Sequence, residues 1–186
     1  KSEFLAQQKF YIKEIRTTIT NKFYYIDKEE LNWKPSKKDW SIIEIITHLN
    51  LVNAFYVKSL HKALNSAPLS DTTTHKVRWL GKLLVNWVAP KNKRIGFKIK
   101  TFKKLDPKTH QKKGVKLVEH IVLADFLSDL TEFEKIITEC EHKNIEDVKV
   151  STMAKSLKIS LGDALAFSIA HIRRHVLQAT ELSNIH

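Results

Sequence analysis

The sequence predicts an all-α fold, a four-helix bundle with a long basic connection between its second and third helices. Four segments of roughly 20 residues carry apolar residues at helical spacing, and helices of that length bury such stripes best against one another. The chain has only 4 glycines and 4 prolines in 186 residues, too few for the frequent tight turns of an all-β fold. The length, with 42% hydrophobic and 28% charged residues, fits a single domain over residues 1–186.

The first two predicted helices lie in the N-terminal third of the chain. We expect the first over about Phe4 to Ile26, because its apolar residues recur at intervals of 3 and 4. These residues are Ile12, Ile15, Ile19 and Phe23. The second begins at Ser41, since Ser41 and Glu44 have the spacing of a capping box, in which each side chain accepts from the other residue's backbone N–H. Its apolar stripe continues to about residue 60.

The last two predicted helices follow the basic connection. The third is expected from about Lys113 to His142 and the fourth from Ser160, where Asp163 stands at the third helical position after the cap. Both carry apolar stripes at helical spacing: Leu123, Phe126, Leu130, Phe133 and Ile137 in the third, and Leu161, Leu165, Ile172 and Val176 in the fourth.

The connection between the second and third helices covers about residues 66–112 and contains most of the positive charge. Residues 72–118 include 14 lysines and arginines but one acid, Asp106, which gives a net charge of +13 against +12 for the whole chain. The remainder is therefore close to neutral. We expect one short helix over residues 77–88 and a small β element around Arg94 to Phe102, where apolar and charged residues alternate.

Aromatic residues interleave with these cations, and two interpretations remain open. Cations neutralise phosphates and aromatic rings stack on bases, so the segment is compatible with binding of nucleic acid or another polyanion. Alternatively it is a solvated basic loop whose aromatic side chains pack into the domain. We favour the second interpretation, because no known nucleic-acid motif accompanies the charge. The aromatic residues are Trp79, Trp87, Phe97 and Phe102.

Several classes of protein are excluded or disfavoured. A single cysteine, Cys140, excludes an internal disulfide and a cysteine-rich zinc cluster. No histidine or aspartate stands at a spacing typical of an activated cysteine, so a cysteine nucleophile is disfavoured. No phosphate-binding loop, dinucleotide-binding fingerprint or serine-hydrolase motif is present. No apolar run approaches the length of a membrane span and no signal peptide is visible, so we expect a cytoplasmic protein without a membrane partner.

Three of the nine histidines form a candidate metal site. His171 and His175 are one turn apart on one face of the fourth predicted helix, close enough to share a metal ion, although such pairs are also common at solvated helix surfaces. His48 lies in an apolar stretch of the second helix, where its ring needs a partner. That partner is either another side chain or, if His48 faces the other two across the bundle, a shared metal ion.

Three further residues are weaker candidates at this site. Glu44 precedes His48 by one turn and is placed either to hold a ligand ring or to cap the helix, and the capping box favours the cap. Gln178 shares the face of His171 and His175 and is the other polar candidate beside the ligands. His120, in the third helix, is a reserve ligand.

Two separated motifs resemble the DinB-like (DinB/YfiT) metalloprotein superfamily. Trp33-Lys-Pro35 followed by Trp40-Ser-Ile-Ile-Glu-Ile-Ile-Thr-His48 is similar to its N-terminal signature. Ser160-Leu-Gly-Asp163, and then His171-Ile-Arg-Arg-His175, is similar to its closing helix. The resemblance covers essentially the whole chain, but it does not explain the heavy positive charge of the connection.

This resemblance implies a four-helix bundle with one divalent metal ion, nickel or zinc, held by His48, His171 and His175. Relatives include transferases and isomerases that use a small thiol such as bacillithiol or mycothiol, and others are described as metal-dependent hydrolases. Many relatives are homodimers.

The hypothesis we carry forward is a metal-dependent enzyme acting on a small molecule. An open coordination position would hold a thiol or water with a lowered pKa, which would give thiol-dependent S-transfer or hydrolysis. The basic connection would attract an anionic substrate or thiol. The alternatives are a non-catalytic module that binds nucleic acid or another polyanion, and a bundle that acts through dimerisation or a partner.

Overall fold

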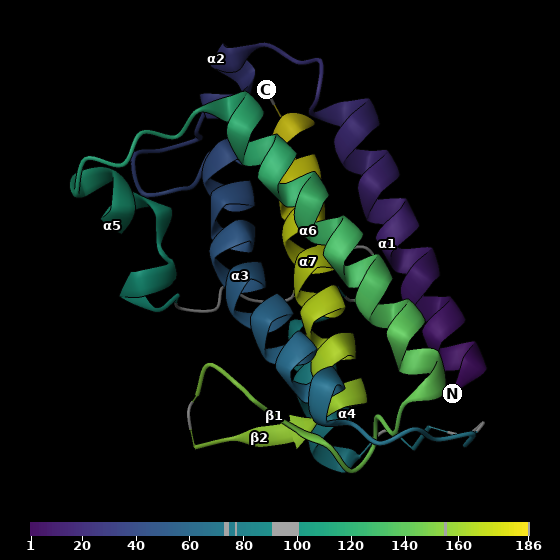
Figure 1. The fold of residues 1–186 in the computed structure, drawn as a ribbon. Coiled ribbons are helices and arrows are strands. Elements are labelled where there is room, and N and C mark those ends of the chain that lie inside the picture. Colours follow the sequence, from purple (N-terminus) through teal and green to yellow (C-terminus); the bar gives the residue numbers. More distant parts are fainter. Residues whose placement is uncertain (73–74, 77, 91–100, 155, 186) are drawn as a thin grey trace.

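The computed structural model describes residues 1–72, 75–76, 78–90, 101–154 and 156–185. Within these residues the fold is mostly helical, as predicted. Its four long helices are α1 (Ser2–Lys22), α3 (Ile42–Ser66), α6 (Glu119–Glu139) and α7 (Leu161–Ser183). The helices α1 and α3 each pack against both α6 and α7, and all four run alongside one another (Figure 1).

The shared interior of the four helices is an apolar core. Its largest fully buried side chains include three phenylalanines, and α3 has buried residues around most of its circumference over its first two turns. A helix that is apolar all round its surface must be covered on several sides, which places the first half of α3 centrally among the other elements. Phe23, Phe126 and Phe133 are the three phenylalanines.

The sequence signals for helix starts are confirmed in α3 and α7. Ser41 and Glu44 form the complete capping box at the start of α3, and the Ser160 hydroxyl accepts a hydrogen bond from the Asp163 backbone N–H at the start of α7. These caps fix where the two helices begin. They therefore also fix the positions of the histidines one and more turns later.

Two predicted helix ends were wrong. The third helix begins at Glu119 rather than Lys113, because Gly114 has a φ of +88°, which a right-handed helix cannot contain. The first helix ends at Lys22 rather than Ile26, and Tyr24 and Tyr25 beyond it are exposed.

Short elements complete the described fold. The short helix α2 (Lys28–Asn32) precedes α3. The helix α4 (Trp79–Val88) packs against α7, and its bounds are close to those predicted, residues 77–88. A 3₁₀ turn η1 (Lys103–Leu105) and α5 (Pro107–Lys112) follow, and η2 (Cys140–His142) extends α6. The β element expected around Arg94 to Phe102 falls largely on residues 91–100, which lie outside the described residues.

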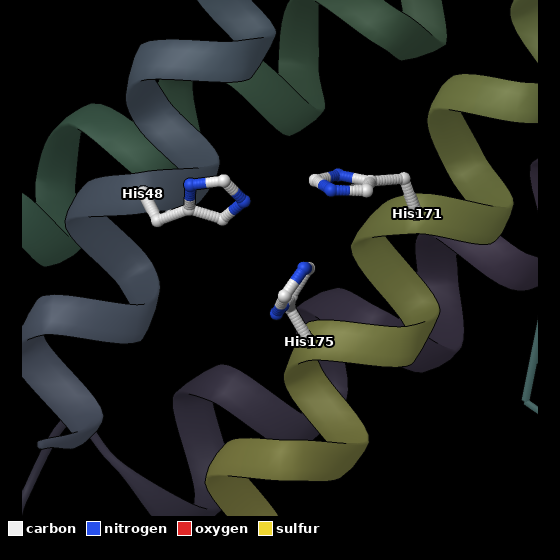
Figure 2. A group of neighbouring side chains, drawn as sticks. All are labelled: His48, His171 and His175. Carbon is white, nitrogen blue, oxygen red and sulfur yellow. The ribbon is translucent and has the colours of Figure 1, made fainter. Parts of the chain in front are cut away.

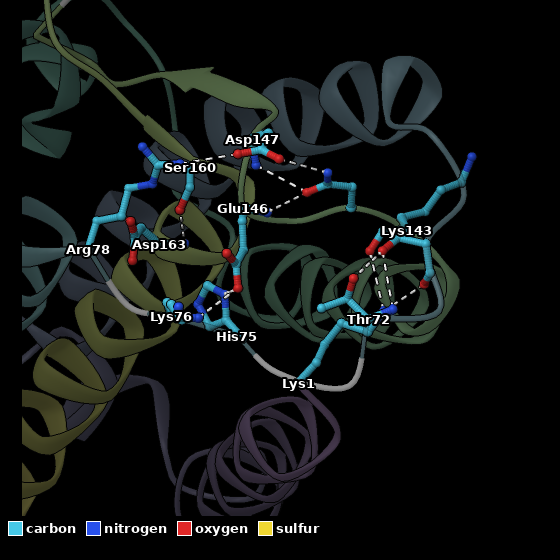
Figure 3. Close-up of polar contacts among 12 residues, drawn as sticks. Lys1, Thr72, His75, Lys76, Arg78, Lys143, Glu146, Asp147, Ser160 and Asp163 are labelled. Carbon is cyan, nitrogen blue, oxygen red and sulfur yellow. Dashed lines mark hydrogen bonds and ion pairs between the residues drawn. The ribbon is translucent and has the colours of Figure 1, made fainter.

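An antiparallel pair of three-residue strands closes one end of the molecule. Strand β1 (Lys149–Ser151) pairs with β2 (Lys158–Ser160), with Val150 opposite Ile159, both buried (Figure 1). This pair was not expected from the sequence. The preceding loop also holds the start of the connection, because Glu146 accepts from the Lys76 backbone N–H at 2.7 Å and Asp147 pairs with Arg78 at 3.3 Å (Figure 3).

Candidate metal centre

Two helices supply the three candidate ligands. His48 is on α3, and His171 and His175 are one turn apart on α7, which packs directly against α3. The three rings point toward one another across the space between the helices (Figure 2). The structure thus brings together the three residues that the sequence singled out.

The spacing of the three rings fits a common metal ion. One ring nitrogen from each histidine lies within 4.8 Å of the others, and the ring centroids are 4.6–5.3 Å apart. Two nitrogens bound to one zinc ion, each about 2.0–2.1 Å from it, lie roughly 3–4 Å apart. Small side-chain movements therefore suffice to bring all three within bonding distance of one ion.

Hydrogen bonds orient two of the rings and select their tautomers. The Nδ1 atom of His48 lies 2.9 Å from the carbonyl oxygen of Leu105, and Nδ1 of His175 lies 2.9 Å from Oε1 of Gln178. Both oxygens only accept, so each Nδ1 must carry the proton and donate it. The Nε2 lone pair of each ring is then available for a metal, the arrangement typical of histidine ligands.

The electrostatics of the group favour neutral imidazoles. The pKa of His171 lies well below its ordinary value because of burial first, and then because of the neighbouring His175, His48 and Arg174. Burial likewise lowers the pKa of His175 to about 3, and that of His48 below its ordinary value. Neutral imidazole is the form that binds a metal ion, so the donor set fits a divalent cation.

Aromatic side chains surround the three histidines. The Trp40 ring lies 5.0 Å from His48 and 6.4 Å from His175, and Phe167 stacks on His171 at 6.4 Å. His48 is buried, whereas His171 and His175 keep some exposed surface.

Two surface cavities lie away from these residues. One, of about 380 Å³, adjoins the start of α1 and the connection, and the other, of about 300 Å³, lies between α1, α4 and α7. Neither is lined by the three histidines.

Of the weaker candidates Gln178, Glu44 and His120, only Gln178 is shown in contact with one of the three histidines. Gln178 contacts the ring of a candidate ligand, His175, whereas both carboxylate oxygens of Glu44 are used elsewhere: one accepts from the Ser41 backbone N–H and the other pairs with Lys34 at 2.6 Å. Glu44 is thus a cap, the role that the capping box favoured. His120 is exposed and is not among the grouped histidines.

The remaining nucleophile candidate is excluded by its surroundings. Cys140 is fully buried, and burial raises the pKa of its thiol to about 12. A thiol that stays protonated and inaccessible cannot attack a substrate. The structure thus agrees with the expectation that this cysteine is not catalytic.

One contact at the site was missed by the sequence analysis. The carbonyl group of Leu105, on the connection, is the partner of His48, 57 residues away in the chain. Every residue carries a backbone carbonyl, so residue type gives no signal for such a contact. Only the path of the connection brings it to the ligand.

Comparison with known proteins agrees with this geometry. A model of the DinB superfamily matches residues 23–179, a span that includes all three histidines. Searches among curated proteins and solved structures found no match. Among the described helices, none combines the length and apolar character needed to cross a membrane. Since the family match covers most of the chain, this protein belongs to the DinB superfamily.

Proposed function

We propose that His48, His171 and His175 bind one divalent metal ion, nickel or zinc, within a four-helix bundle formed by α1, α3, α6 and α7 as a single domain. The observation that carries the proposal is the convergence of three imidazole rings, two of them with Nδ1 already used in a hydrogen bond. Three histidines leave at least one coordination position open, the pattern of catalytic rather than structural sites.

Elemental analysis of untagged protein purified without chelator tests the metal site. We expect about one nickel or zinc ion per chain, lost in both His48→Ala and His171→Ala. His142→Ala, at an exposed histidine outside the group, is the matched control and should keep the metal. Wild-type protein that takes up neither ion, even when it is added in excess, would contradict the proposal.

For the reaction we propose thiol-dependent S-transfer, with hydrolysis as the alternative at the same site. A bound divalent ion supplies a lowered pKa to a thiol or water that it holds. The aromatic rings of Trp40 and Phe167 limit the water around the three histidines and offer apolar surface to a small electrophile. In S-transfer the thiol sulfur bonds to the electrophilic carbon, the bond from that carbon to its leaving group breaks, and the thiol proton is released.

The charge of the connection supports an anionic co-substrate. Leu105, which contacts His48, is preceded directly by two exposed cations, Lys103 and Lys104. Such cations attract anions over a distance of about 10 Å at moderate salt. A carboxylate-bearing thiol such as bacillithiol fits this charge better than a neutral thiol.

Parallel assays with the metal-loaded protein distinguish the two reactions. One assay offers bacillithiol or mycothiol with an epoxide or alkyl halide, and the other offers ester and amide substrates without thiol. Turnover that requires the thiol and is lost in His171→Ala supports S-transfer, whereas turnover without thiol supports hydrolysis. Activity that survives in His171→Ala would contradict both.

A second candidate function, polyanion binding by the connection, is favoured by one observation. The expectation that the aromatic side chains of the connection pack into the domain was wrong for the three that the structure describes, because Trp79, Phe102 and Trp87 are 77%, 59% and 48% exposed. Exposed aromatic rings near lysines can stack on unpaired bases. Tight binding of a single-stranded oligonucleotide that weakens steeply with salt and is lost in Trp79→Ala would support it, and salt-independent binding would contradict it.

The homodimer implied by the family resemblance stays a prediction. Light scattering at several protein concentrations measures the mass in solution directly. A mass near 43 kDa, about twice the chain's 21.6 kDa, would confirm it.

A further inference from the structure

One stretch of the connection lies against the metal ligand on α3. We call residues 102–113, which contain η1 and α5, the docking arm. Its Leu105 carbonyl oxygen is 2.9 Å from Nδ1 of His48, and this contact is buried. Both η1 and α5 pack against α3. The docking arm therefore supplies the hydrogen bond that orients His48, although it is distant from His48 in sequence.

The docking arm is anchored to the rest of the fold at Leu105 and at residues that follow it. The Leu105 side chain is only 8% exposed and belongs to the main apolar core, and Pro107 is buried as well. The Lys108 ammonium group donates to the backbone carbonyl of Lys37 at 2.9 Å. Lys37 belongs to the same loop as Trp40, whose ring lies against His48.

Hydrogen bonds within the docking arm hold its shape. The Asp106 carboxylate accepts from the Lys108 backbone N–H at 3.0 Å and caps α5. The His110 ring lies 2.8 Å from the Lys104 carbonyl oxygen, and the Leu105 N–H donates to Phe102 at 2.8 Å. The position of the Leu105 carbonyl thus depends on the fold of the whole arm and not on Leu105 alone.

We propose that docking of this arm and metal binding by the three histidines are energetically coupled. The inference rests on the proposed metal site and concerns its regulation. With the arm docked, the carbonyl of Leu105 holds the His48 ring in the tautomer and orientation that a metal ion requires. With the arm displaced, His48 would lose that partner, and the tautomer and orientation of its ring would no longer be fixed.

Coupling of this kind is reciprocal. If docking raises the affinity for metal by a given factor, metal raises the equilibrium constant for docking by the same factor. The chain offers a direct readout, because five trypsin cleavage sites lie on the arm, at Lys103, Lys104, Lys108, Lys112 and Lys113. Lys149 on β1, exposed and on another element, is an internal reference site.

The first experiment is limited trypsin digestion of the wild-type chain with and without nickel or zinc, with the cleavage sites identified by mass. We expect metal to slow cleavage on the docking arm about 5-fold or more, relative to Lys149. Equal protection at the arm and at Lys149 would overturn the coupling. The same samples are titrated with metal, so a chain that binds no metal contradicts the proposed function separately.

The second experiment measures the metal affinity of arm variants by calorimetry. Leu105→Ala weakens the anchor, and Asp106→Ala removes the cap of α5 together with a negative charge that acts on His48. Asp106→Asn loses the same charge but keeps an oxygen that can cap α5, so it is the control for charge. We expect Leu105→Ala and Asp106→Ala to bind metal about 10- to 100-fold more weakly, the range found when partners of ligand histidines are lost, and Asp106→Asn to bind it more tightly than Asp106→Ala. Trypsin cleavage on the arm should then be faster and should respond less to metal.

The matched control is Leu64→Ala, on the same helix as His48 but 16 residues further along, about 24 Å by helical rise. Leu64 is more deeply buried than Leu105, so its truncation should destabilise the protein at least as much. We expect its metal affinity to stay within about 3-fold of wild type, a smaller change than coupling requires. Equal weakening in Leu64→Ala and Leu105→Ala would mean general destabilisation and would overturn the proposal, as would unchanged affinity in both arm variants.

Discussion

His175 and Gln178 form a hydrogen-bonded pair on one face of α7, with 2.9 Å between Nδ1 of the ring and Oε1 of the amide. The pair is local, because residues three apart on a helix are neighbours. The amide therefore orients a candidate ligand without help from any other element. Among the weaker candidates from the sequence, Gln178 is the one that forms a hydrogen bond with one of the three histidines.

Replacement of Gln178 should weaken metal binding without disrupting the fold. In Gln178→Leu the ring of His175 loses its acceptor and either tautomer becomes accessible, so we expect nickel or zinc affinity to fall about 10- to 100-fold. Gln178→Glu keeps an acceptor at the same place and should retain most of the affinity. Calorimetric titration of the two variants measures the difference, and equal affinity in both would show that the pair does not position the ring.

A second prediction concerns the close approach of α4 to α7. The Asp163 carboxylate, only 1% exposed, occupies the space that a side chain at Gly81 would need, and an added Cβ would overlap it. Gly81→Ala should therefore destabilise the protein by about 1–3 kcal/mol, which lowers the melting temperature by several degrees. Asn86→Ala, at an exposed position of the same helix, should have little effect.

A double-variant cycle tests this explanation. If the cost arises from overlap with the carboxylate, Gly81→Ala should cost less when Asp163 is already replaced by Ser. Urea unfolding of the four proteins gives the coupling free energy. A cost that is the same in both backgrounds would show that the two residues are independent.

Much of the fold follows from signals in the sequence. The starts of α3 and α7 were predictable because Ser41 and Ser160 stand before apolar runs with an acid three residues later, a local pattern with a local cause. The start of α6 was not predictable, because it depends on the left-handed conformation of Gly114, and that conformation is set by the turn that follows α5. The strands β1 and β2 have three residues each, too few to show a period.

Some residues of the candidate site were predictable from the sequence and others were not. His171 and His175 are predictable as a pair from their spacing alone, and Gln178 from its place on the same face. The meeting of these residues with His48 depends on the packing of α3 against α7, and the family resemblance indicated it in advance. The Leu105 carbonyl was not predictable, because it depends on the path of the connection.

His75 should make the protein sensitive to mild acid. Its side chain is 1% exposed, lies 4.4 Å from the ring of Phe4, and has no hydrogen-bond partner at either ring nitrogen. Burial lowers its pKa, although the carboxylates of Asp163 and Glu146 oppose that shift and the N-terminal ammonium group adds to it (Figure 3). The folded protein therefore favours the neutral ring.

The sign of the effect follows from linkage. Above about pH 6.5 the ring is neutral in both states, and below it the unfolded chain takes up the proton first, so stability falls as the pH decreases toward the folded pKa. His75→Phe cannot take up this proton and should lose less stability between pH 7 and pH 5 than the wild type. His142→Gln, at an exposed histidine, is the control. Identical pH profiles for wild type and His75→Phe would refute the prediction.

Asp129 should have the opposite dependence on pH. Burial raises the pKa of its carboxyl group to about 6, with the nearby Asn53 amide opposing this and the charges of Asp125 and Glu132 adding to it. The folded protein thus favours the protonated acid, and the stability that this provides is lost as the pH rises from the ordinary value near 4 through about 6.

Asp129→Asn remains neutral at every pH and should be the more stable protein at pH 8. The carboxyl group is partly exposed, so we expect an increase in melting temperature of at most about 2–4 °C. The advantage should shrink toward pH 4 to 5, where the wild-type carboxyl group is protonated as well. Glu139→Gln, at an exposed acid of the same helix, should show no such pH dependence, and thermal unfolding of all three proteins at pH 5 and pH 8 decides the point.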